Sequence, residues 1–332
     1  MGFNDGSNAL ATTVATRAIK PNIAVITTAI TKFSIPILVY IVGVLFHISG
    51  FTLADNISKK TIYFTYFFEI SQEKAFSFLF AGVIAAIIWG GIAYTLKVPN
   101  STSHTLLGAI IGSGIAAFGF QAIQWKEYVG VNIVLMVALA PIITLIIAYL
   151  FMKLVRKLMR HAHRGINNVF MILQRINLVL LASTFSLNNS QKALSVFMMI
   201  GMLGLSEYSR SSVPFWAVLV ISVSLAAGVM LGGYRVINTV GRKIFRLQPV
   251  HSVAAQVSTS LLMLIASQLG ISVSTGQVMS SAVIGVGAAE KLRHVQWNMA
   301  LRIVISWALT LPIAASLGAV VYLFVSKVIF KV

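Results

Sequence analysis

The chain has no cysteine, and charged residues are scarce among its 332 residues. The absence of cysteine excludes disulfides, thiol catalysis and thiolate metal sites. Only 10% of the residues are charged, against about 25% in an average soluble domain. Carboxylates are the rarest charged group, with seven Asp and Glu against 25 Lys and Arg. An enzyme built on paired carboxylates, or on a metal site of histidines and carboxylates, has almost no material here, so we expect no enzyme.

Hydrophobic residues are abundant, at 58% of the chain, and the mean hydropathy is +0.91. Several apolar runs are long enough to cross a hydrocarbon core of about 30 Å. The sequence therefore predicts an all-α polytopic protein of the cell membrane, embedded in the lipid bilayer, with about ten membrane segments. We expect these segments near 21–48, 76–96, 103–119, 129–151, 174–187, 190–205, 213–234, 252–269, 271–288 and 298–326.

The formal net charge of +18 has a membrane explanation. Lys and Arg collect in the cytoplasmic loops of membrane proteins, and most of these residues lie between apolar runs. We therefore expect no nucleic-acid binding. The basic stretches 152–168 and 235–249 are predicted to be cytoplasmic, and the neutral stretch 51–75 extracellular. Residues 1–20 are polar, so no cleavable signal peptide is predicted.

Two pairs of motifs form an internal repeat. Residues 98–114 align without gaps with 271–287, and Phe3–Ala9 corresponds to Leu187–Ala193. The loop charges make the matched apolar segments run in opposite directions, which predicts an inverted repeat with interrupted helices. The predicted units are a first transmembrane repeat, a basic cytoplasmic linker and a second transmembrane repeat, at 1–151, 152–173 and 174–332.

The first pair of motifs is rich in Ser, Thr and Gly. Pro99 favours an interrupted helix, after which a Ser or Thr caps the next half-helix. Helix N-termini carry partial positive charge and free N–H groups, so two of them with several hydroxyl groups can hold a tetrahedral oxyanion. The residues predicted to bind it are Ser101, Thr102, Ser103, Ser274, Thr275 and Gly276.

The second pair of motifs is predicted to couple cations or protons. It consists of Asn4 and Asp5 in the first half and of Asn188 and Asn189 in the second. Carboxylate and amide oxygens are ligands for hard cations such as Na⁺, and Asp5 can instead carry a proton. The metal prediction is therefore sodium at Asp5, with no other cofactor. Four further polar residues are expected to modulate the site: Lys32, His104, Lys192 and Gln277.

These motifs resemble those of the inorganic phosphate transporter (PiT) family. The likeness is carried by GFNDGSNALATTVATRAIKP, by KVPNSTSHTLLGAIIGSG and by their degenerate second copies, and it covers nearly the whole chain. Members are symporters that move phosphate with sodium, or with protons as a metal–phosphate complex, and one branch carries sulfate. The resemblance implies that the Ser/Thr motifs hold phosphate and that the Asn-Asp motifs hold cations.

The chain departs from the family pattern mainly in its second half. Asn188 and Asn189 stand where a second Asn-Asp is usual, and Phe185 replaces a histidine. The second Ser-Thr-Thr-His becomes Ser274 to Gln277, and Lys32 stands where asparagine is common. These changes point to fewer coupled sodium ions. The chain also begins inside the first motif, so the first helix is half-length or the natural start lies earlier.

The sequence thus predicts a secondary transporter of inorganic phosphate that works by alternating access, coupled to protons, to sodium or to both. A sulfate permease of the same family is the nearest alternative. A membrane enzyme acting on phosphorylated lipids and a non-transporting sensor are alternatives from other classes. The sequence leaves a homo-oligomer open.

Overall fold

The computed structural model describes residues 1–47, 50–63, 71–96, 100–161, 163, 165–204, 213–232 and 245–330. Within these ranges the regular elements are helices, and the β-structure consists of an isolated bridge between Ile62 and Ile123. The predicted all-α class is therefore confirmed. The helices run in the order α1 Gly2–Ala15, α2 Pro21–Phe46, α3 Thr52–Lys60, α5 Gln72–Thr95, α6 Thr102–Phe118, α7 Met136–Leu158, α8 Ile166–Gly204, α9 Phe215–Gly232, α10 Pro249–Gln268, α11 Thr275–Glu290 and α12 Trp297–Val325.

Seven of the described helical segments are long and apolar enough to cross a membrane. They are Pro21–Phe46, Glu73–Thr95, Trp125–Leu158, Ile166–Met202, Phe215–Gly232, Pro249–Gln268 and Trp297–Val328. The helices α6 and α11 have 17 and 16 residues. At 1.5 Å per residue, each is only about 25 Å long, shorter than a hydrocarbon core of about 30 Å. The ten predicted segments are therefore not confirmed as ten separate spans.

Two predicted segments, 174–187 and 190–205, are one continuous helix, α8. The prediction of a break between them was wrong. No proline or glycine stands between residues 166 and 200, so nothing in the backbone ends the helix at the Asn pair. The polar side chains remain in a buried helix because they find hydrogen-bond partners on neighbouring elements.

The stretch 51–75, predicted as a loop, contains the short helix α3. Its inner face is buried, and the Leu53 N–H donates to Oε1 of Gln191 on α8 at 2.8 Å. Lys59 and Lys60 at its end are exposed. Similarly, α7 ends at Leu158 and α8 begins at Ile166, so helix extends into both sides of the predicted linker 152–173.

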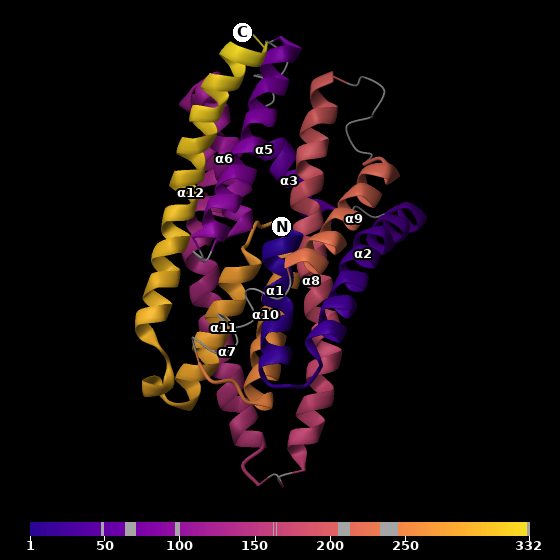
Figure 1. Cartoon of the computed structure of the whole chain (residues 1–332), viewed down its shortest axis with the longest axis vertical. Helices are drawn as coiled ribbons and strands as arrows, with labels where there is room; N and C mark the ends of the chain where they lie inside the picture. Colours follow the sequence, from indigo (N-terminus) through magenta and orange to yellow (C-terminus); the bar gives the residue numbers. More distant parts are fainter. Residues whose placement is uncertain are drawn as a thin grey trace.

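Helices that are far apart in the sequence pack closely. Figure 1 shows α12 along the side of α6, and α11 beside α7. Small residues permit this approach: a Cβ atom at Gly112 would lie 1.8 Å from the carbonyl oxygen of Ala315, and one at Gly285 would lie 2.3 Å from that of Leu145. The N-terminal helix α1 lies inside the bundle, against α8 and α9.

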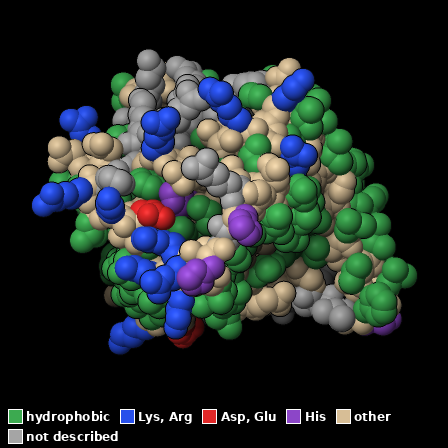
Figure 2. Space-filling model, turned by 90° about the horizontal axis from the view of Figure 1, so that it is seen from below, with side chains coloured by type: hydrophobic (Ala, Val, Ile, Leu, Met, Phe, Trp, Pro, Cys, Tyr) green, Lys and Arg blue, Asp and Glu red, His purple; other side chains and the backbone are tan. Residues whose placement is uncertain are grey.

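Basic side chains gather at the end of the molecule that is lowest in Figure 1. Figure 2 looks at this end and shows many Lys and Arg side chains on it. The turn from α1 to α2 and the connection from α7 to α8 both lie there. Exposed basic residues of these two connections include Arg17, Lys20, Lys157 and Arg160. Basic residues of this kind are typical of cytoplasmic loops, so the cytoplasmic position of the linker stays a prediction.

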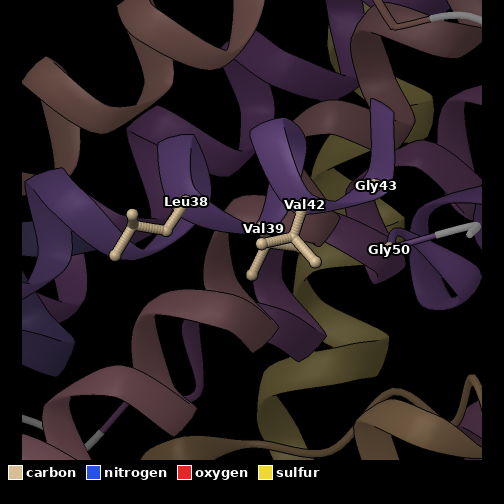
Figure 3. A pocket seen from close by; sticks show the side chains of 5 residues that line it. All are labelled: Leu38, Val39, Val42, Gly43 and Gly50. Carbon is tan, nitrogen blue, oxygen red and sulfur yellow. The ribbon is translucent and has the colours of Figure 1, made fainter. Parts of the chain in front are cut away.

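A small surface pocket of about 190 Å³ lies beside the end of α2 (Figure 3). Its lining consists of Leu38, Val39, Val42, Gly43 and Gly50. No polar side chain takes part, and none of the predicted site residues is included. The pocket offers no groups that could hold an anion, so the functional site must be sought in the polar interior.

Candidate functional site

The four predicted motifs, which lie between Phe3 and residue 287 of the sequence, meet in the interior of the bundle. They come from α1, from the start of α6, from the middle of α8 and from the start of α11. Nearly all of the predicted site residues are buried, although polar groups are rarely buried without partners. The buried set is Asp5, Lys32, Ser101, Thr102, Ser103, His104, Asn188, Asn189, Lys192, Ser274, Thr275 and Gln277. Asn4 and Gly276 are half-buried.

Each Ser/Thr motif stands at a helix N-terminus, as predicted. Ser101 is the N-cap of α6, and its Oγ accepts a hydrogen bond from the backbone N–H of His104 at 3.3 Å. Ser274 holds the N-cap position of α11 without a side-chain capping bond. The interruption predicted at Pro99 lies outside the described residues. Two partial positive ends therefore lie next to the buried cluster.

Asp5 joins three of the motifs. Its Oδ2 accepts hydrogen bonds from Oγ1 of Thr102 at 2.6 Å and from Nδ2 of Asn189 at 3.1 Å. Asp5 is only 2% exposed. A buried carboxylate is expensive unless it is hydrogen-bonded or paired with a cation, and this one lies in the first turn of a helix, which favours negative charge.

Lys192 connects the second Ser/Thr motif, at the start of α11, to the other three motifs. Its Nζ donates to Oγ of Ser103 at 2.6 Å and to the carbonyl oxygen of Val273 at 2.5 Å. A third hydrogen bond runs to Oδ1 of Asn188, one turn earlier on α8. The Lys192 ammonium thus bridges the start of α6, the middle of α8 and the residue before Ser274.

Repeat-related residues touch each other in this cluster. His104 and Gln277 occupy the same position in the two Ser/Thr motifs, and their Nδ1 and Nε2 atoms lie 3.4 Å apart. Asp5 and Asn189 occupy the same position in the two Asn motifs and are hydrogen-bonded. Contacts between equivalent positions are expected close to a two-fold axis, where each residue meets its own counterpart.

Several buried polar atoms of the cluster have no hydrogen-bond partner within the described part of the chain. They are Nζ of Lys32, Oγ1 of Thr275, Oε1 of Gln277 and Oδ1 of Asn189. Lys32 lies within electrostatic range of Asp5. Unsatisfied buried groups are rare in folded proteins, and a cluster of donors and acceptors of this kind is typical of a site that binds a polar ligand.

Sequence reasoning missed two groups of the cluster. The first is Asn8, whose Nδ2 would lie 3.0 Å from a Cβ atom at Gly276. Its signal was present, because the alignment of the Asn motifs pairs Asn8 with Lys192. The second is the carbonyl oxygen of Val273, a backbone group that every residue has and that the residue type therefore cannot indicate. Asn4 was also predicted for the site, and it lies half-buried beside Asp5 in α1.

No group of three or more His, Cys, Asp or Glu side chains suited to a metal ion occurs among the described residues. A hard monovalent cation near Asp5 would therefore use this carboxylate together with amide, hydroxyl or backbone oxygens. Asp5 has such neighbours in Thr102 and Asn189, and Oδ1 of Asn189 is free of other partners in the described structure. The donor set fits Na⁺ or a proton.

The chain is similar to known transporters over nearly its whole length. Residues 1–318 match the model of the phosphate transporter family. A probable low-affinity inorganic phosphate transporter of Bacillus subtilis (strain 168) is 32% identical over 99% of this chain and 93% of its own length. A protein of the same description from Rhizobium meliloti (strain 1021) is 29% identical over 97% of this chain and 91% of its own length.

A solved structure has the same fold. It is described as the sodium-dependent phosphate transporter, and it superimposes with a TM-score of 0.80 at 23% sequence identity, covering 99% of this chain and 96% of the other. The match supports the overall arrangement of helices. The family of this chain and its apolar helices show that it is a multi-pass protein of the cell membrane. Together, the motifs, the cluster that they form and the match over residues 1–318 establish that this chain belongs to the phosphate transporter family.

Proposed function

We propose that the chain is a symporter that moves inorganic phosphate across the cell membrane by alternating access, coupled to protons, to sodium or to both. The observation that carries this proposal is the buried cluster in which two Ser/Thr helix N-termini and two Asn motifs meet around Asp5 and Lys192. Substrate sites of secondary transporters commonly lie where two repeats meet at the membrane midplane. The relatives named above are described as phosphate transporters.

The anion would bind at the two Ser/Thr motifs. Within the described part of the chain, the buried Thr275 hydroxyl has no hydrogen-bond partner, and Lys32 supplies a buried ammonium group that also has none. Helix N-termini add N–H donors and partial positive charge. We assign phosphate binding to Ser101, Thr102, Ser103, Ser274, Thr275 and Gly276. Sulfate, the alternative considered from the sequence, has no support in the description of the matched family model or in those of the relatives named above.

The coupling ion would bind at Asp5. A carboxylate can take up either a proton or Na⁺, and the side-chain amide oxygen of Asn189 would contribute to a sodium site. The sodium-dependent protein of the same fold is consistent with sodium in this role. We place Asn4, Asp5, Asn188 and Asn189 in the coupling site and His104, Gln277, Lys32 and Lys192 beside it.

We further propose that the two halves, 1–151 and 174–332, form an inverted repeat joined by the cytoplasmic linker 152–173. The contact of Asp5 with Asn189 and that of His104 with Gln277 support a pseudo-two-fold axis through the site. A second support lies outside the site: Nε1 of Trp125 donates to the carbonyl of Phe120 at 3.0 Å, and Nε1 of Trp297 donates in the same way to that of Leu292 at 2.9 Å.

Uptake of radiolabelled phosphate into proteoliposomes tests this function. We expect uptake that an imposed ion gradient accelerates, that arsenate inhibits and that excess sulfate leaves largely unchanged. Within this experiment, Thr275→Val should raise the KM for phosphate about tenfold or more, because a hydrogen bond to a charged group is worth about 1.5–3 kcal/mol. Thr102→Val should act in the same direction.

Thr144→Val is the matched control for these variants. Thr144 is also a buried helical threonine, but its hydroxyl donates to the carbonyl of Ala140 in its own helix at 2.6 Å. The KM of Thr144→Val for phosphate should stay close to that of the unmodified protein. A normal KM in both Thr102→Val and Thr275→Val would remove these residues from the phosphate site, and absence of phosphate uptake by the unmodified protein would overturn the function.

Labelling of single cysteines tests the orientation, and the lack of native cysteine removes any background. An impermeant thiol reagent should modify Lys60→Cys in intact cells and should reach His161→Cys only after permeabilisation. Both positions are exposed. The expectation follows from the basic residues around the second position. Modification of His161→Cys alone in intact cells would show that the orientation is opposite to the predicted one. Modification of both Lys60→Cys and His161→Cys in intact cells would contradict the predicted topology.

A further inference from the structure

Lys192 lies in the middle of α8 and is completely buried, with 0% of its surface exposed. An ammonium group has three N–H donors. All three have oxygen partners: a hydroxyl of Ser103, a side-chain amide of Asn188 and the backbone carbonyl of Val273. The charge is therefore surrounded by the kinds of oxygen atom that would otherwise coordinate a hard metal cation.

None of these three partners is charged. The ion pairs found in the described part of the chain involve Asp55 and Glu290, and none includes Lys192. Removing a lysine from water is costly, and intramembrane lysines normally lie beside a carboxylate or at the interface. Asp5 lies within electrostatic range of Lys192, but the atoms that contact the ammonium directly are neutral oxygens from three separate elements. They replace the solvent shell, as they would around a bound Na⁺.

Comparison of the two halves shows where this ammonium lies. The repeat pairs Asp5 with Asn189 and Asn8 with Lys192. Asn8 lies beside Gly276, and Lys192 contacts Ser103, the repeat counterpart of Gly276. The first half therefore has a carboxylate and a neutral amide at two positions where the second half has a neutral amide and an ammonium. The half-site with Asp5 can bind an added cation, whereas the half-site with Lys192 already contains a positive charge.

We propose that the Lys192 ammonium is a tethered cation that permanently occupies the cation site of the second half and takes the place of one coupling ion. This inference rests on the proposed function, because it assumes a coupling site in each half. The second site then binds no sodium, and the positive charge that accompanies the anion there belongs to the protein. Removal of the side chain should leave a set of oxygen ligands that Na⁺ can enter.

Thermal unfolding of the detergent-purified full chain without phosphate tests the proposal independently of transport. We compare the melting temperature of Lys192→Ala in NaCl and in choline chloride at equal ionic strength. Sodium should raise it by about 3 °C or more beyond its effect on the unmodified protein, because an ion that binds only the folded state stabilises it. Lys192→Gln provides a second variant if the alanine variant does not fold.

Two controls separate a vacated cation site from a general effect of charge removal. Lys192→Arg keeps a charge in place and should gain no sodium response. Lys32→Ala also removes a fully buried lysine within electrostatic range of Asp5, but the Lys32 ammonium has no hydrogen-bond partner in the described structure. This variant therefore controls for the loss of a positive charge near Asp5 without the loss of a set of oxygen ligands. An equal sodium response in Lys192→Ala, Lys32→Ala and the unmodified protein would overturn the proposal.

Proteoliposome uptake provides the functional measurement. In choline medium, Lys192→Ala should transport phosphate at least about tenfold more slowly than the unmodified protein, since three hydrogen bonds to a charge are lost. Added Na⁺ should restore much of this rate. Full uptake by Lys192→Ala without sodium would contradict the proposal. If the unmodified protein carries no phosphate, the proposed function fails, and the melting temperatures still decide whether Lys192 occupies a cation site.

Discussion

Asp5→Asn is expected to abolish the dependence of phosphate uptake on an imposed pH gradient. Asp5 is the carboxylate at the centre of the cluster, where it accepts hydrogen bonds from Thr102 and Asn189. The asparagine side chain has nearly the same shape but can neither bind a proton at physiological pH nor supply charge to a cation. The gradient-driven rate should therefore fall at least about tenfold, to the level of downhill movement, because the loss of a charged partner is worth about 1.5–3 kcal/mol.

Asp55→Asn is the matched control. Asp55 lies on α3, outside the cluster, and pairs with Lys59 at 3.1 Å across one helical turn. Such a partly exposed pair contributes about 0.3–0.5 kcal/mol, so both uptake and its pH dependence should be retained. The measurement is the initial rate of uptake with an acid outside solution, with and without sodium. Weak activation by sodium is expected. Cooperative activation with a Hill coefficient of about two or more would instead indicate several coupled sodium ions.

The second large effect is expected at the contact between α6 and α12. Gly112→Ala places a methyl group where the Cβ would lie 1.8 Å from the carbonyl oxygen of Ala315, so one helix must move. Overpacking of this kind typically destabilises a protein by about 1–3 kcal/mol, and a clash with backbone belongs at the upper end. The melting temperature of the purified protein should fall clearly. Gly285→Ala should behave similarly, because its Cβ would lie 2.3 Å from the carbonyl oxygen of Leu145.

Gly91→Ala tests whether this effect is one of packing. A Cβ atom at Gly91 would meet no atom of the chain within 4 Å. Alanine is a better helix former than glycine by about 0.5–1 kcal/mol, so this variant should be as stable as the unmodified protein or slightly more stable. Equal melting temperatures for Gly112→Ala and Gly91→Ala would show that α6 and α12 do not approach as closely as described.

The sequence determined the class of the protein and indicated the residues that we propose for its site. Long apolar runs and the scarcity of charge were sufficient for the all-α membrane fold, because hydrocarbon accepts only backbones that satisfy their own hydrogen bonds. The internal repeat then selected Ser101, Thr102, Ser274 and Thr275 among many hydroxyl residues. Their positions at two helix starts followed from local capping preferences. Apolar runs, repeated motifs and capping residues are all patterns of residue type that can be recognised without knowing which helices pack together.

Tertiary structure decided how these residues are used. The path of α8 through the Asn pair depends on partners from other helices, and the sequence alone indicated a break there. The role that we propose for Lys192 depends on the carbonyl oxygen of Val273, which lies 81 residues further along the chain. A backbone acceptor carries no signal in the residue type, and the energy of a buried charge depends on which groups surround it in space. The sequence could therefore indicate the candidate site, whereas only the packing of α1, α6, α8 and α11 creates the different surroundings of Asp5 and Lys192 on which their proposed roles rest.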